Sequence, residues 1–209
     1  MYYILSPLSL ILPEVLLLLG ALSNIILATQ NRPEKWSHIV TQSSILLALF
    51  ANLLRPTSMV FLFSKMLLLD KITIVLVSLI LGLAFVVLTL SPLSLKRHNI
   101  PESEFYALSL LSILGMCIMV AGQHYLVLYL GLELMSFPLY AMIAMNRKLK
   151  SAEAALKYFI TGAIASGLFL YGISLFYGLT GSLTVQHIPT SIAIKNSLGE
   201  SQPLLYAVA

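Results

Sequence analysis

A single carboxylate inside a very long apolar stretch is the feature that most restricts how this chain can fold. Across residues 105–145 the only formally charged residue is Glu133. A membrane-spanning helix needs about 20 apolar residues, so this stretch is long enough for two spans. The segment AGQH, residues 121–124, lies near its middle and predicts the turn that joins them.

The whole chain has the composition of a membrane protein. Hydrophobic residues make up 59% of the 209 residues and charged residues 10%, whereas soluble domains have about 25% charged residues. Because so little polar surface cannot cover a globule in water, the bilayer must be the solvent. The chain is therefore predicted to be an all-α, polytopic helix bundle, one transmembrane domain over residues 1–209. About six complete spans are expected, at residues 7–29, 36–54 and 71–90, on either side of the turn in 105–145, and at 151–177.

The segments outside these spans differ in character. Residues 55–70 mix polar and apolar side chains and are too short and too punctuated to cross. After Gly178 comes a polar loop, and a new apolar run begins at Pro203, so the chain is expected to be the N-terminal portion of a longer protein, truncated before a seventh helix. The first run lacks the positive start of a secretory signal and contains Glu14, which predicts a retained helix.

The basic residues between the spans predict the orientation, because Lys and Arg concentrate in cytoplasmic loops. The N-terminus is expected outside, since the connections after spans one, three and five are the richer in basic residues. Those connections hold Arg32, Lys35, Lys96, Arg97, Arg147, Lys148 and Lys150, and the opposite side holds Arg55, Lys65, Lys71 and Lys195.

Glu133 is the main candidate for a functional residue. A charge at mid-membrane costs ~2.5–3.5 kcal/mol on insertion scales, so something must compensate it. Steps of three and four residues place it on one helix face with hydroxyl-bearing side chains, which should face protein or water and not lipid. Pro138 frees a backbone carbonyl one turn back, where a helix can kink. The alternative is a protonated glutamic acid that merely bonds a tyrosine. The full stripe is Tyr125, Tyr129, Glu133, Ser136 and Tyr140.

Lys157 and Glu14 allow two interpretations each. Lys157 lies about two turns inside the last span, so it either takes part in transport or reaches the basic surface and pairs with Glu153 four residues earlier. Glu14 suits the first turn of its helix as an interfacial carboxylate, with a transport role as the alternative. In the same last span, Gly162 with Ser166 and Ala163 with Gly167 form small-xxx-small pairs that favour close helix packing.

Other chemistries are not indicated. Cys117 is alone and is interpreted as a packing residue, so this chain offers neither an intramolecular disulfide nor a cysteine metal site. The basic residues form no dense patch that would bind nucleic acid. No phosphate loop, CxxC pair or nucleophile with a base is present, and no redox centre is expected. The histidines have no metal-ligand spacing and are assigned to interfaces; they are His38, His98, His124 and His187.

Two segments carry a resemblance to a known family. YLVLYLGLELMSFPLYAMIAMNR, followed by KSAEAALKYFITGAIASGLFLYGISLFYGLTGS, resembles helices five and six of the antiporter-like N subunit of NADH:quinone oxidoreductase, respiratory complex I. ILPEVLLLLG is similar to the opening helix of that family. The resemblance covers nearly the whole chain.

The resemblance implies a proton-translocating membrane subunit that couples quinone reduction to proton transfer. Family members have about fourteen helices with two inverted five-helix repeats. Their helix-five glutamate corresponds to Glu133 and acts with a lysine of helix seven; their helix-six lysine corresponds to Lys157. No cofactor is expected in this chain, because NAD, FMN, iron–sulfur clusters and quinone belong to other subunits. The implied partners are other membrane subunits, the lipid bilayer and protons, in a bacterial inner membrane.

Two other interpretations stay open. Subunits of Mrp-type cation/proton antiporters share the general pattern and would exchange Na⁺ or K⁺ for protons without a redox partner. The second interpretation is a structural or assembly membrane protein in which Glu133 is inert. An incomplete chain would not pump alone, and Glu133 is expected to pair with a lysine from a helix beyond Ala209, because Lys157 is too far along the bilayer normal for direct contact.

Overall fold

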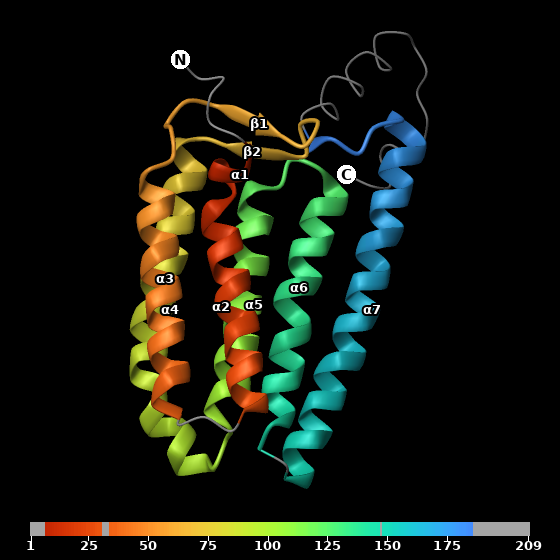
Figure 1. Cartoon of the computed structure of the whole chain (residues 1–209). Helices are drawn as coiled ribbons and strands as arrows, with labels where there is room; N and C mark the ends of the chain where they lie inside the picture. Colours follow the sequence, from red (N-terminus) through yellow and green to blue (C-terminus); the bar gives the residue numbers. More distant parts are fainter. Residues whose placement is uncertain (1–6, 31–33, 147, 186–209) are drawn as a thin grey trace, which may run out of the picture.

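A computed structural model describes residues 7–30, 34–146 and 148–185 as an upright bundle of long helices (Figure 1). Each predicted span corresponds to a helix, and the turn at residues 121–124 separates two of them as expected. The helices are α1 Pro7–Leu10, α2 Leu12–Thr29, α3 Glu34–Leu53, α4 Lys71–His98, α5 Glu102–Ala121, α6 Tyr125–Ala144 and α7 Leu149–Thr180.

The third span is longer than predicted, because α4 continues past residue 90 to His98. Pro92 lies within the helix, and basic residues in its last turn suit the negative end of the helix dipole. Asp70 caps the start by accepting the Thr73 backbone N–H at 2.8 Å. Asn99 ends the helix in the left-handed conformation, at φ 52°.

The helix α3 crosses the membrane with its polar side inward. Five helices in the described residues, α2 and α4 to α7, are long and apolar enough to span by composition alone. The 20-residue α3 is more polar. Ser37, Thr41 and Asn52 are nevertheless buried against its neighbours, whereas Trp36 and Phe50 are exposed on the outer face. Because polar side chains point into the bundle and apolar ones to lipid, α3 provides the sixth span.

Residues 55–70 do not cross, as predicted, but they form a β-hairpin that the sequence did not indicate. Strand β1, Val60–Leu62, pairs antiparallel with β2, Leu67–Leu69. The hairpin lies across the helix ends that adjoin the start of α2 (Figure 1). The backbone of Met66 accepts the Gln123 N–H at 2.8 Å, so the hairpin is joined to the α5–α6 turn.

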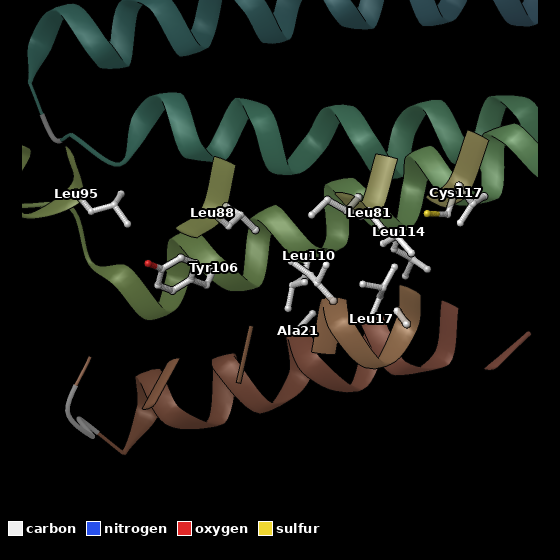
Figure 2. Packing of buried hydrophobic residues seen from close by; sticks show 13 residues of the cluster. Leu17, Ala21, Leu81, Leu88, Leu95, Tyr106, Leu110, Leu114 and Cys117 are labelled. Atoms are coloured by element: carbon white, nitrogen blue, oxygen red, sulfur yellow. The ribbon is translucent and has the colours of Figure 1, made fainter. Parts of the chain in front are cut away.

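The core is centred on α5, which packs against α2, α3, α4 and α6. Leu17 of α2, Leu81 of α4 and Leu110 of α5 are fully buried there (Figure 2). Cys117 belongs to the same cluster, as expected for a packing residue. The side chains drawn in Figure 2 come from all four of the helices α2 to α5.

The helices α5 and α6 approach each other through two glycines. A Cβ atom added to Gly115 would lie 2.5 Å from the backbone nitrogen of Met135, and one added to Gly131 would lie 2.9 Å from that of Met119. These contacts are between backbones, so neither helix accepts a side chain there. The last helix, α7, packs on α6 and is otherwise mostly exposed.

The helix directions agree with the predicted arrangement of connections. The C-terminal ends of α2, α4 and α6 lie at one end of the bundle, and the hairpin lies at the other (Figure 1). Because Arg55 is buried, it does not count among the surface charges at the hairpin end, and the difference in basic residues between the two ends increases. Arg32, Arg147 and Lys195 lie outside the described residues, as do His187 and the apolar run from Pro203. The side of the membrane on which the N-terminus lies stays a prediction.

Candidate functional site

Glu133 lies near the middle of α6 and faces α7. It is half-buried, about 12 Å along the helix from Tyr125 at 1.5 Å per residue. The hydroxyl of Ser166, on α7, donates a hydrogen bond to the Oε1 atom of Glu133. The Glu133 carboxylate therefore has a hydrogen-bond donor on α7, the next helix in the chain. It lies in the seam between α6 and α7.

The hydroxyl stripe on α6 faces protein, as predicted. Tyr125 stacks on Phe176 with ring centroids 6.0 Å apart, and Tyr129 stacks on Phe169 at 6.4 Å. Tyr129 is also close enough to Glu133 to interact with its charge. The stripe thus forms much of the α6–α7 contact.

An aromatic cluster closes the same seam on the other side of Glu133. The ring of Tyr140 meets Tyr158 edge-on at 5.0 Å and Phe159 at 5.8 Å. Gly162 lies directly beneath the Tyr140 hydroxyl, where any side chain would collide with it. Aromatic contacts consequently flank the Glu133–Ser166 hydrogen bond towards both ends of α6.

Ser136 belongs to the predicted stripe but does not reach the carboxylate. It is buried, and its hydroxyl donates to the backbone oxygen of Leu132 at 2.7 Å. The hydroxyl that donates to Glu133 is that of Ser166, which the sequence indicated only as one member of a small-xxx-small pair. That pair, Gly162 with Ser166, faces α6 as a packing pair should; the other, Ala163 with Gly167, is exposed.

Lys157 does not meet Glu133 in the described part of the chain. Its Nζ atom lies 2.5 Å from Glu153 Oε1, the intrahelical pair that the sequence offered as one alternative. Both side chains are largely exposed, at 74% for Lys157 and 59% for Glu153. Lys157 also lies about 14 Å along α7 from Ser166. Direct contact with Glu133 is excluded in this arrangement, as expected.

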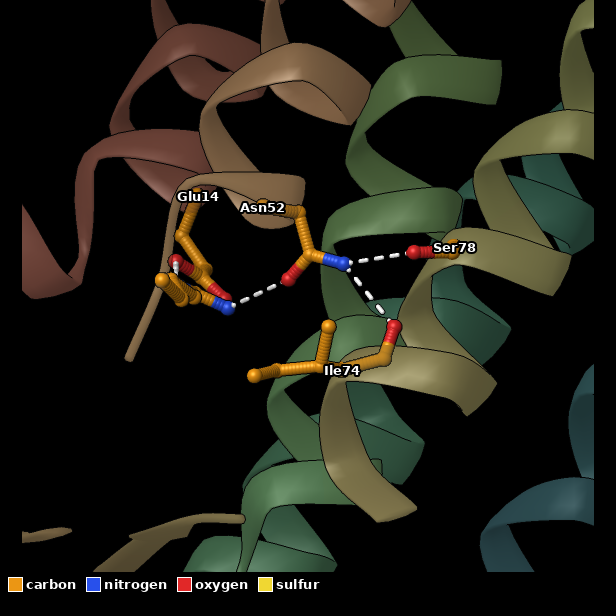
Figure 3. A network of polar contacts seen from close by, with 5 residues as sticks. Glu14, Asn52, Ile74 and Ser78 are labelled. Carbon is orange, nitrogen blue, oxygen red and sulfur yellow. Dashed lines mark hydrogen bonds and ion pairs between the residues drawn. The ribbon is translucent and has the colours of Figure 1, made fainter. Parts of the chain in front are cut away.

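A buried ion pair at the hairpin end was not predicted. Arg55 Nη2 donates to Glu14 Oε2, and the side chains are 1% and 17% exposed. Glu14 occupies the first turn of α2 as expected, but its partner is 41 positions away and was assigned to a surface connection. That assignment was wrong because Arg55 folds inward. Asn52 extends the network, accepting from Arg55 and donating to Ser78 and to the Ile74 carbonyl at 2.9 Å each (Figure 3).

A second buried polar group joins α2, α3, α4 and α5 near the opposite end of the bundle. Asn24 donates to Thr41 Oγ1 at 3.0 Å. His38 Nδ1 lies 3.1 Å from the Tyr106 hydroxyl, which also accepts from Ser91. These are contacts between helices within the part that the structure describes, and none of them reaches Glu133.

A large apolar groove elsewhere on the bundle does not contain the candidate residue. It measures about 760 Å³ and is lined mainly by apolar side chains of α4, α5 and α6, with Tyr158 of α7 at its edge. Glu133 lies in the neighbouring seam. The groove is open and its lining is mainly apolar, so we do not assign the chemistry to it.

One family model matches the part of the chain that contains α6 and α7. Residues 121–208 match the family model described as the membrane domain of NADH:quinone oxidoreductase and Mrp antiporters. This match includes Glu133, Lys157 and Ser166.

Curated relatives match along more of the chain. The chain is 36% identical over 204 residues to NADH-quinone oxidoreductase subunit N of Ruthia magnifica subsp. Calyptogena magnifica, covering 96% of this chain and 42% of the relative. It is 37% identical over 193 residues to the same subunit of Alkalilimnicola ehrlichii, covering 89% and 39%. The chain thus spans about two fifths of the length of these relatives.

Two solved structures share the fold. Respiratory complex I from Thermus thermophilus with bound aureothin contains a chain that is 31% identical, with a TM-score of 0.68, over 82% of this chain and 38% of that one. An archaeal membrane-bound sulfane sulfur reductase matches with a TM-score of 0.75 over 88% and 39%. At 21% identity the second likeness concerns the fold alone.

Proposed function

Since this chain belongs to the subunit N family of NADH-quinone oxidoreductase, we propose that it forms part of the proton-translocating membrane arm of respiratory complex I. It is an integral, multi-pass protein of the bacterial inner membrane. Its relatives are named as subunits of a redox enzyme. We assign the electron transfer, with NAD, FMN, iron–sulfur clusters and quinone, to other subunits, and we assign to this chain a step of proton transfer.

The observation that supports this proposal is the position of Glu133. It is a carboxylate at mid-span, on a face that another helix covers, with a hydroxyl donor bonded to it. Ionisable groups at this depth are costly, and they mark proton routes in transport proteins. The carboxylate accepts a proton and becomes a neutral acid, then returns the proton when its surroundings favour the charged form.

The driving force for that exchange is electrostatic. A cation near a carboxylate favours its ionised form, and removing the cation increases its proton affinity. Lys157 is paired with Glu153 at the exposed start of α7, so we propose that it serves the proton path at the cytoplasmic surface. A lysine from a helix beyond the described residues would act on Glu133 directly. Other membrane subunits of the complex, lipid and protons are the proposed partners, and nucleic acid is not.

The test is Glu133→Gln in the full-length subunit within the assembled complex. Glutamine has the size of glutamate and keeps a hydrogen-bond acceptor, but its amide does not take up or release a proton near neutral pH. We expect reduced proton pumping and slower coupled quinone reduction in proteoliposomes, with assembly unchanged on native gels. Glu104→Gln, which neutralises an exposed carboxylate in the first turn of α5, is the control. Wild-type pumping per NADH with glutamine at position 133 would refute the proposal.

The same experiment addresses the other two functions. An Mrp-type exchanger, which the matching family model also covers, would make proton movement depend on Na⁺ or K⁺ and not on NADH. A purely structural role would leave pumping intact while changing stability. The relatives named as subunit N favour the redox-linked function.

A further inference from the structure

We propose that Ser166 is a positioning residue for Glu133, so that the docking of α7 against α6 sets the proton affinity of the carboxylate. This inference rests on the proposed role of Glu133 in proton transfer. It starts from the direct contact, in which the Ser166 hydroxyl donates to Oε1 of Glu133. A donor to a carboxylate stabilises the charged form and is worth more than a bond between neutral groups.

Ser166 is held where it can act by its neighbours on α7. One turn earlier, Gly162 leaves room for the Tyr140 hydroxyl, and the Tyr140 ring meets the rings of Phe137, Tyr158 and Phe159 edge-on. These contacts oppose a swing of the Tyr140 ring. A side chain at position 162 collides with this ring, and moving α7 away from α6 to relieve the collision separates the serine from the carboxylate.

The other titratable groups around Glu133 do not replace this contact. On α6, Tyr129 interacts with Glu133 through charge and hydrogen bonding, but it belongs to the same helix and stays beside the carboxylate wherever α7 lies. Tyr140 is engaged with Tyr158 of α7. The charged residues of α7 lie at its far end, where Lys157 is paired with Glu153. On α5, the other helix packed on α6, the titratable residues are Glu102, Glu104, Tyr106 and Cys117; Tyr106 bonds to α3 and α4, and Cys117 lies in the core with α2.

Movement of α7 would then work as a switch. With α7 docked, the hydroxyl stabilises the carboxylate and the proton leaves. With α7 withdrawn, the Ser166 donor is lost and the Tyr129 interaction alone remains, so the ionised form is less stabilised and Glu133 takes up a proton. Since the contact joins two adjacent helices, a small displacement of α7 is sufficient to break it.

The experiment compares serine variants in the full-length subunit within the complex. Ser166→Ala removes the donor, and we expect the pH midpoint of pumping to move about one unit towards alkaline pH, because the ionised form loses a charge-assisted bond. Ser166→Thr keeps the hydroxyl and should restore the wild-type midpoint. Ser136→Ala is the matched control, because this nearby buried hydroxyl bonds only to its own helix.

A second pair tests the docking without changing any polar atom. Gly162→Ala should shift the midpoint in the same direction as Ser166→Ala, since the added methyl group collides with Tyr140. Gly167→Ala should not, because nothing lies within 4 Å of that position. The protonation of Glu133 is followed directly by infrared difference spectroscopy, with its carboxylic acid band identified by its loss in Glu133→Gln.

The outcomes separate this inference from the proposed function. If Glu133→Gln reduces pumping while both Ser166→Ala and Gly162→Ala retain the wild-type midpoint and infrared titration, the positioning role is wrong and the proton-transfer role stands. If Glu133→Gln pumps normally, the proposed function fails first. A shift in Ser136→Ala as large as that in Ser166→Ala would also overturn the inference.

Discussion

Replacing Arg55 by methionine should destabilise the bundle far more than removing an exposed ion pair. Arg55 is 1% exposed and its partner Glu14 is 17% exposed, so methionine leaves a carboxylate in a mostly dry site. Breaking a buried pair by removing one partner costs about 3–5 kcal/mol. Asn52 also loses the donor to its side-chain oxygen. For a helix bundle of about 200 residues that unfolds as one unit, about 3 kcal/mol corresponds to a fall of roughly 6–12 °C in Tm.

The chain supplies its own control. Glu153→Gln breaks the exposed pair with Lys157, and such i,i+4 pairs contribute about 0.3–0.5 kcal/mol. The readout is the temperature at which half of the subunit is lost from the purified complex on native gels. The double variant Glu14→Gln with Arg55→Met should recover most of the loss, because no unpaired charge remains. A Tm for Arg55→Met within 1–2 °C of that for Glu153→Gln, about the width expected for a surface pair, would refute the reasoning.

Three further predictions concern packing, topology and Lys157. Gly115→Ala should weaken assembly, because its Cβ would meet backbone atoms of α6, whereas Gly82→Ala in α4 meets nothing within 4 Å and should be neutral or slightly stabilising in the same thermal assay. A cysteine replacing Lys148 should react with a membrane-impermeant reagent only in inside-out vesicles, and one replacing Lys65 only in intact cells; the reverse labelling would mean that the N-terminus is cytoplasmic. Lys157→Ala should reduce pumping by no more than Glu133→Gln does. A wild-type rate would mean that Lys157 has no role beyond its surface pair with Glu153.

The spans were predictable from sequence because they depend on local length and apolar content. The turn at residues 121–124 was found because one stretch was too long for a single helix. The stripe containing Tyr129 and Glu133 was found because helical spacing places these residues on one face, and burying that face against α7 is the physical consequence. The membrane prevents a polar face from pointing outward, so these predictions need no knowledge of which helices are neighbours.

The contacts that were missed all depend on tertiary pairing. The residues LLL of β2 have no alternating pattern, so the hairpin has no signal in hydrophobic period. Arg55 pairs with Glu14 across 41 positions, and its place in a connection suggested a surface charge. The Ser166 contact requires the rotation of α7 about its own axis, which spacing along one helix does not determine. One usable signal was Gly162, since a small residue one turn before the serine marks the face that approaches another helix.

The two halves of the bundle are held by different forces, and this decides which part can move. Hydrogen bonds and an ion pair between side chains join α2, α3, α4 and α5 at both ends, and α6 is fastened to α5 by backbone contact at Gly115 and Gly131. Across the described length of α7, the side-chain hydrogen bond to α6 is that of Ser166 with Glu133, and aromatic rings support it. Beyond the end of α7, backbone bonds hold the chain to the start of α6, where the Tyr125 N–H donates to Leu183 at 2.9 Å and the Val185 N–H donates to Gln123 at 3.1 Å. Directional bonds resist sliding, whereas ring contacts tolerate a range of offsets. Among the helices that the structure describes, α7 makes its contacts chiefly with α6, so a shift of α7 around Ser166 disturbs the packing of α2 to α5 little. Within the described residues, the carboxylate therefore lies at a helix contact that can open while α2 to α5 stay packed, which is a requirement for changing its proton affinity repeatedly without unfolding the bundle.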